Sequence, residues 1–74
     1  MNNEQRENIK SVMNMLSDAS VITDAVQTDV ADRTEHLPKG SEERNVMDRI
    51  DLHLIQAYVH IRKACEALDS ALEV

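Results

Sequence analysis

The sequence contains no tryptophan and no phenylalanine, and its single aromatic residue is Tyr58. Any hydrophobic interior must therefore be built from aliphatic and methionine side chains. Proteins that bind single-stranded nucleic acid without sequence preference stack the bases on aromatic side chains. The composition therefore argues against general nucleic-acid binding.

Cysteine is equally scarce, because Cys65 is the only one. No disulfide within the chain can hold the fold, and a lone cysteine fits a reducing, cytoplasmic setting. A chain of 74 residues makes at most one domain, and a domain this small buries only about 60% of its unfolded surface. Small scaffolds without disulfides are stabilised by a metal or by partner subunits. We therefore expect a homo-oligomer.

Positive charge is also limited, with 8 lysine and arginine residues against 14 acidic residues and a formal net charge of −6. This balance argues against general affinity for nucleic-acid phosphates or anionic membranes. No apolar run approaches the ~20 residues of a membrane span. The polar segment 1–10 has no hydrophobic stretch of the signal-peptide kind. We expect a soluble, cytoplasmic protein that does not bind membranes.

Proline and glycine each occur once, as Pro38 and Gly40. Pro38 disfavours helical geometry at Leu37, Gly40 can adopt a positive φ, and Ser41 is a good N-cap. One pair of helix breakers near the midpoint predicts one reversal of the chain. The expected fold is all-α, a single-domain antiparallel two-helix hairpin with helices over about 3–36 and 42–72 and a turn at 37–41.

The first helix has a capping-box spacing at Asn2 and Gln5. Its predicted contact line repeats at intervals of three and four residues, which is typical of packed helices, and includes Thr23 among the apolar residues Ile9, Val12, Leu16, Ala19, Val26 and Val30. A second apolar group lies off this line: Met13, Met15, Ile22 and Ala25. We expect any kink at 17–20, where serine and aspartate cluster.

The second helix has a predicted contact line of Met47, Ile50, Leu54, Ala57, Ile61, Ala64, Leu68 and Ala71, widened by Tyr58, Cys65 and Leu72. Three further apolar residues lie on its opposite side: Leu52, Ile55 and Val59. One hairpin cannot cover so many apolar faces, which favours a helical-bundle oligomer of two, four or six chains. The predicted oligomer interface contains Met15, Ile22, Leu52, Ile55 and Val59.

Residues that usually carry chemistry are not arranged in a recognisable motif. His53 and His60 are seven residues apart, whereas helical zinc ligands are typically four apart. The positions one turn from Cys65 hold Ile61 and Asp69. We predict no catalytic site, no metal site and no cofactor, so the chain is not expected to be an enzyme.

The strongest local signal is basic charge around the turn, where four of the eight lysine and arginine residues fall: Arg33, Lys39, Arg44 and Arg49. Exposed amides at a helix N-terminus together with basic side chains suit a phosphate. The candidate anion ligands are Arg33, Thr34, Lys39, Ser41 and Arg44. The same charges could instead form local ion pairs with Glu35, Glu43, Asp48 or Asp51.

Three parts of the second half carry a resemblance to a known family: the segment 37–43, the segment 46–51, and Ala57 with the triplet 61–63. Together they resemble the helical hairpin of phage-encoded cyclic-nucleotide sponges, the anti-CBASS and anti-Thoeris proteins that sequester immune signalling nucleotides. The resemblance implies a multimer that binds a cyclic nucleotide between protomers without cleaving it. It also implies that the basic turn contacts phosphates and that Tyr58 contacts a base.

These observations predict a non-catalytic binding protein. One hypothesis is a phage-type sponge for cyclic nucleotide signals. The alternative is an acidic helical adaptor or inhibitor that binds a host protein, either as a nucleic-acid mimic or through an exposed helix face.

Overall fold

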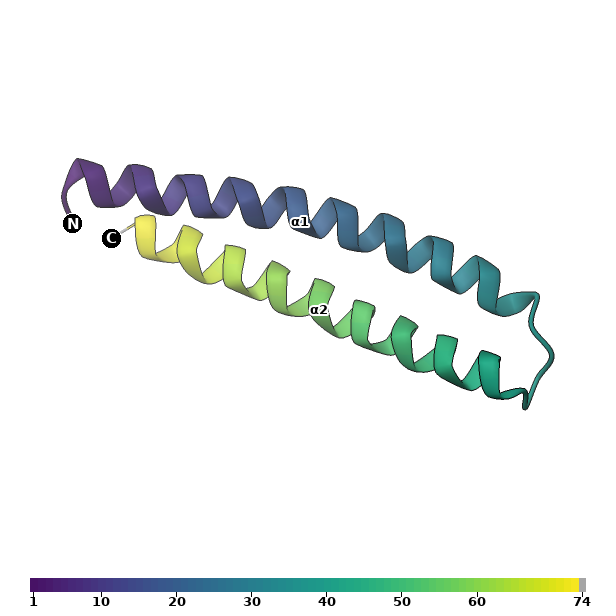
Figure 1. Cartoon of the computed structure of the whole chain (residues 1–74). Coiled ribbons are helices and arrows are strands. Elements are labelled where there is room, and N and C mark those ends of the chain that lie inside the picture. The colour runs from purple at the N-terminus through teal and green to yellow at the C-terminus, as the bar shows by residue number, and fades with distance from the viewer. Residues whose placement is uncertain (74) are drawn as a thin grey trace.

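A computed structural model describes residues 1–73 of the chain. Its two helices are α1, Asn3–Glu35, and α2, Glu42–Leu72. They lie side by side and antiparallel, so both chain ends are at the same end of a rod with extents of 55 × 15 × 13 Å (Figure 1). The predicted all-α, two-helix hairpin is confirmed, with α1 ending one residue before the expected 36.

Both helices begin at the residues that local sequence rules select. The Asn2 side chain accepts a hydrogen bond from the Gln5 amide at 2.8 Å, and the Gln5 side chain accepts one from the Asn2 amide at 3.0 Å. These reciprocal bonds are the predicted capping box. At the start of α2, Ser41 Oγ accepts a hydrogen bond from the Arg44 amide at 3.2 Å. Each cap satisfies backbone donors that a helix start leaves unpaired.

The reversal between the helices is a tight turn at Pro38–Ser41. The Ser41 amide donates to the Pro38 carbonyl at 3.2 Å. Gly40 has a φ of 81°, and no other described residue has a positive φ. A positive φ at the third position is the requirement of a type II turn, and glycine meets it without a steric penalty.

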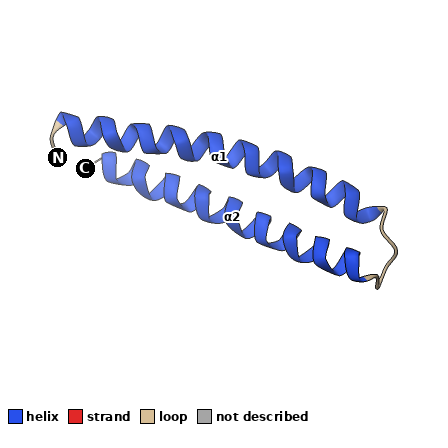
Figure 2. Ribbon diagram, in the orientation of Figure 1, coloured by secondary structure: helices blue, strands red, loops and turns tan. Residues whose placement is uncertain are grey.

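The expectation of a kink at 17–20 is wrong, because α1 is helical without a break from Asn3 to Glu35 (Figure 2). Its hydroxyl side chains bond to carbonyls of their own helix. Ser20 donates to the Ser17 carbonyl and Thr23 to the Ala19 carbonyl, both at 2.7 Å. The polar side chains are thereby satisfied within the helix and do not interrupt it.

The helices meet along two lines of side chains on each helix, and each line repeats every seven residues. On α1 the first line is Arg6, Met13, Ser20, Gln27 and Thr34, and the second line is Ile9, Leu16, Thr23 and Val30. On α2 the first line is Arg44, Asp51, Tyr58, Cys65 and Leu72, and the second line is Met47, Leu54, Ile61 and Leu68. All of these residues are buried or half-buried, and together they give the 3-4 alternation of a coiled coil.

The predicted contact lines were each partly wrong. On α1, Val12 and Val26 are 46% and 45% exposed, and Met13 and Gln27 occupy the contact positions next to them. On α2, the predicted Ile50, Ala57 and Ala71 are exposed, and their C-terminal neighbours Asp51, Tyr58 and Leu72 are half-buried. At these positions the contact with the other helix is made by the next residue along the chain. Each helix is therefore turned about its own axis, so that its most apolar side does not face the other helix.

Two polar contacts define the alignment of the helices. Arg6 Nη1 donates to the Leu72 carbonyl at 2.9 Å, and Gln27 Nε2 donates to Asp51 Oδ1 at 2.8 Å. Both contacts align the two antiparallel helices at the same relative position along their lengths. Both also join the first line of α1 to the first line of α2. The second lines consequently face each other, and Ser20 lies at the level of Tyr58.

The space between the helices does not form a closed hydrophobic core. Within residues 1–73 no hydrophobic side chain is buried, and the two buried residues are Ser20 and Thr34, at 6% and 5% exposure. Two helices can bury only the strip along which they touch. The two buried residues are small hydroxyl residues on the first line of α1, while larger apolar side chains remain partly accessible.

The turn generates a first prediction. Gly40→Ala should reduce the free energy of unfolding by about 1 kcal/mol, because a Cβ disfavours positive φ. A Cβ at this position would meet no atom within 4 Å, so the cost is conformational and not steric. Urea unfolding at fixed protein concentration measures it, with Lys39→Ala in the same turn as the control. Equal stability of Gly40→Ala and wild type would contradict the backbone argument.

The cross-helix hydrogen bond generates a second prediction. Gln27→Leu should destabilise the hairpin by about 1 kcal/mol, because the half-buried Asp51 carboxylate then faces an apolar side chain. Combining it with Asp51→Leu should restore at least wild-type stability by making the contact apolar on both sides. A double-mutant cycle from urea unfolding tests this coupling. Simple additivity of the two single effects would show that the contact is energetically silent.

Candidate interaction surfaces

Most candidate anion ligands at the turn are already used to hold the turn together. Arg44 Nη1 donates to the Leu37 carbonyl at 2.9 Å, and Arg44 is half-buried. Ser41 Oγ donates to the Pro38 carbonyl at 2.8 Å while it caps α2. The buried Thr34 hydroxyl donates to the Val30 carbonyl at 2.7 Å. Of these three, Arg44 links α2 to the end of α1, Ser41 closes the turn, and Thr34 bonds within α1.

The remaining basic residues at the turn differ in their contacts. Arg33 forms an exposed ion pair with Asp29, with 3.0 Å between Nε and Oδ2. Arg49 donates from Nε to the Asn45 carbonyl at 3.4 Å. Lys39 is exposed on the turn. Local contacts thus account for Arg33, Arg44 and Arg49, although their partners differ from those that the sequence suggested.

Tyr58 is far from the turn and is not oriented by it. It belongs to the first line of α2 and is half-buried between the helices. It lies about 25 Å along the helix from Ser41, at 1.5 Å rise per residue. The structure therefore does not bring Tyr58 and the basic turn of the same chain into one site.

The five predicted interface residues are all exposed, but they lie on two different sides. Met15 and Ile22 of α1, 68% and 63% exposed, flank the second line, next to Leu16 and Thr23. The α2 residues Leu52, Ile55 and Val59 flank the first line and are 53%, 44% and 41% exposed. Because first line faces first line, these two groups are on opposite sides of the hairpin.

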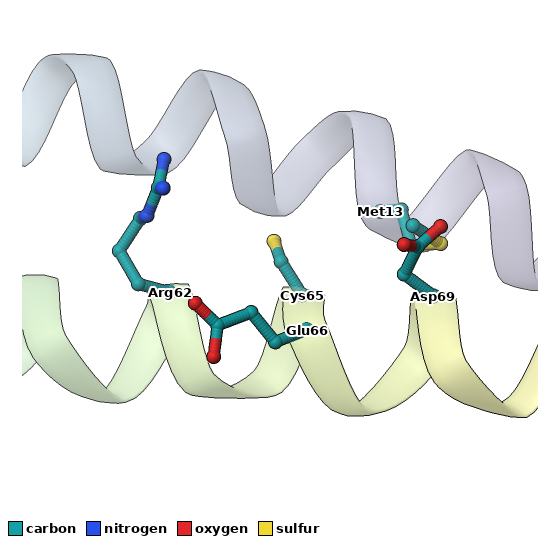
Figure 3. A pocket seen from close by; sticks show the side chains of 5 residues that line it. All are labelled: Met13, Arg62, Cys65, Glu66 and Asp69. Carbon is teal, nitrogen blue, oxygen red and sulfur yellow. The ribbon is translucent and has the colours of Figure 1, made fainter.

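We call the side of the hairpin that the two first lines border the first-line side, and the opposite side the second-line side. A shallow pocket opens on the first-line side, between Met13 of α1 and four residues of α2 (Figure 3). The side chains of Arg62 and Cys65 point toward α1, and Asp69 lines the same pocket. No group of three or more potential ligands among the described residues could hold a metal ion. His53 and His60 are exposed on α2, two turns apart. Cys65 is half-buried at the contact between the helices.

Comparisons with protein-family models, curated proteins and solved structures find no match to this chain. Among the described residues, no helix combines the length and the apolar character needed to cross a membrane.

Proposed function

We propose that the chain is a non-catalytic protein-interaction module that acts as an adaptor or inhibitor and binds its partner through α2. The observation that carries this proposal is the apolar stripe of Leu52, Ile55 and Val59. Their spacing of three and four residues places them on one face of α2 at its centre, and all three are more than 40% exposed. Such a row of anchors is how an amphipathic helix enters an apolar groove on another protein.

The charges around the stripe indicate what kind of partner surface would fit it. Asp48 lies one turn before Leu52, and Glu66 lies two turns after Val59. Asp24 of α1 lies on the same side, since it also flanks the first line. Arg62 is the basic residue on this side of α2, and the whole chain carries a net charge of −6. An apolar groove with a basic rim on the partner would match this surface.

The stripe can be tested with a pair of neighbouring substitutions. Ile55→Asp places a charge within the stripe. Gln56→Asp places the same charge at the next residue, which is also exposed but lies on the side of α2 that faces away from α1. In pull-downs from cells that express the chain naturally, wild type and Gln56→Asp should retain the same partner, in a salt-sensitive manner. Ile55→Asp should lose it. Retention by all three proteins would contradict binding through the stripe.

A second proposal is a phosphate-bearing ligand of the cyclic-nucleotide class at the turn. It is supported by the exposed Lys39 next to the first turn of α2, and by the resemblance of segment 37–43 to nucleotide sponges. Because Tyr58 is about 25 Å along α2 from Ser41, a site containing both would need residues from more than one protomer. This proposal therefore also requires a homo-oligomer.

The nucleotide proposal can be tested at Lys39, because this residue is exposed on the turn, whereas Ser41 and Arg44 form hydrogen bonds that hold the turn together. Lys39→Ala should abolish the thermal shift caused by a panel of cyclic di- and trinucleotides, while Lys63→Ala, on the exposed outer surface of α2, should preserve it. Arg44→Ala is a poor probe because it also removes the hydrogen bond to Leu37. If no nucleotide in the panel shifts the melting temperature of wild type, the proposal is wrong.

We further propose that the hairpin assembles into a homo-oligomeric helical bundle. The observation behind this is that no hydrophobic side chain within residues 1–73 is buried. A fold of this size without a core or a disulfide needs partner subunits for stability.

A further inference from the structure

The most apolar direction of α1 does not point at α2. The first line of α1, which contacts α2, is mainly polar. The large apolar residues Val12, Met15, Ile22 and Val26 flank the second line and are 45–68% exposed. They repeat at three and four residues, with Ala19 completing the series. α1 thus has a second contact line that nothing in the hairpin covers.

α2 contributes to the same side of the hairpin. Val46 and Ile50, each 41% exposed, flank its second line in the same way. Because second line faces second line, the two exposed rows lie on the same side of the hairpin. The register of Gln27 with Asp51 brings Ile50 close to the level of Val26, so the rows meet end to end and form one surface. We call it the open face and define its large residues as Val12, Met15, Ile22 and Val26 of α1 with Val46 and Ile50 of α2.

The open face is almost free of charge. The chain has 14 acidic residues, yet within residues 1–73 the acids near this face are only Glu43 and Asp29, both at its turn end. Asp29 is moreover neutralised by Arg33 at 3.0 Å. Away from the turn end, the ionisable side chains of the open face are His53 and His60 of α2. A basic partner would find no carboxylates to pair with over most of this surface.

A second copy of the chain fits these properties. Two acidic molecules repel each other wherever carboxylates meet, so a surface that excludes carboxylates lets an acidic chain associate with itself without that repulsion. The area agrees with this occupant. The hairpin exposes 5598 Å², whereas a compact monomer of 8.4 kDa is expected to expose ~4,600 Å². The excess of about 1,000 Å² comes from the elongated shape of the whole hairpin, with extents of 55 × 15 × 13 Å, and it is large enough to supply the ~800 Å² that each partner buries in a standard interface.

We propose that two hairpins pack open face to open face, with the two-fold axis parallel to the helices. This inference rests on the oligomeric assembly proposed above and not on the protein or nucleotide partner. The axis lays α1 of each copy along α2 of the other, which makes a four-helix bundle with a self-complementary interface.

The register of the hairpin favours this axis because it matches large side chains with small ones. Each residue of α1 lies at a known level of α2, given by the Arg6–Leu72 and Gln27–Asp51 contacts. With a parallel two-fold axis, Met15 of one copy lies at the level of Ala64 of the other, and Ile22 at the level of Ala57. A perpendicular axis would place α1 antiparallel on α1, so that large side chains of the two copies oppose each other at the same levels. Such a pairing holds the helices farther apart than a pairing of large side chains with alanines, and it packs the interface less closely.

The face is tested by a matched pair of charge substitutions. Ile22→Asp places a carboxylate on the open face, and Ala25→Asp places one on the exposed outer surface of the same helix. Sedimentation equilibrium should give wild type and Ala25→Asp twice the chain mass of 8.4 kDa, and Ile22→Asp the chain mass. A monomeric wild type would overturn both the assembly and the face. A dimeric Ile22→Asp would overturn the face alone.

The axis is tested by disulfide formation between separately prepared single-cysteine variants. In a Cys65→Ala background, Met15→Cys mixed with Ala64→Cys should form a covalent dimer under mild oxidation, and neither variant alone should do so at a comparable rate. Because each chain carries one cysteine, any covalent dimer is intermolecular. Faster cross-linking of Met15→Cys with Ile22→Cys than with Ala64→Cys would indicate the perpendicular axis, which places α1 antiparallel on α1, and would overturn the proposed one. Failure of the mixture to cross-link at all would do the same.

Discussion

The structure depends on one geometric constraint, which is that two helices can cover only one strip of each other. That strip is set by two cross-helix contacts, Gln27 with Asp51 at 2.8 Å and Arg6 with the Leu72 carbonyl at 2.9 Å. Both contacts involve the first line of α1, which is mainly polar. Satisfying these half-buried polar groups therefore rotates the apolar direction of each helix away from its neighbour, since an unpaired polar group at the contact would cost more than an exposed aliphatic one.

The consequence is a hairpin with well-defined ends and an incomplete interior. The capping box at Asn2 and the turn at Pro38–Ser41 provide local order, while the buried positions between the helices are small hydroxyl residues. Local order of this kind determines where helices begin and end, but contributes little of the apolar burial on which stability depends. The missing burial is available on the outside of the hairpin, where another chain can supply it.

The distribution of acidic residues divides that outside into two surfaces of different chemistry. On the first-line side, the stripe of Leu52, Ile55 and Val59 has carboxylates at its borders, which suits a basic protein. On the second-line side, the open face excludes carboxylates over most of its length, which suits an identical acidic chain. If both proposals hold, the two contacts do not compete, because they use opposite sides of the hairpin. One small chain can then assemble with itself and still present a binding surface.

The helices, their caps and the position of the turn could be predicted from the sequence, because proline, glycine and capping residues act within a few residues of themselves. The sequence also showed that more apolar faces exist than one hairpin can cover. It could not select which faces meet, since Val12 and Met13, or Val26 and Gln27, are neighbours that suit a 3-4 pattern about equally well. The pairing of the two helices in space makes this selection. The same pairing shows that Arg44 holds the turn and that Tyr58 lies far from it. The physical reason is that helix pairing is chosen by contacts between residues distant in sequence, such as Gln27 and Asp51, which no local pattern contains.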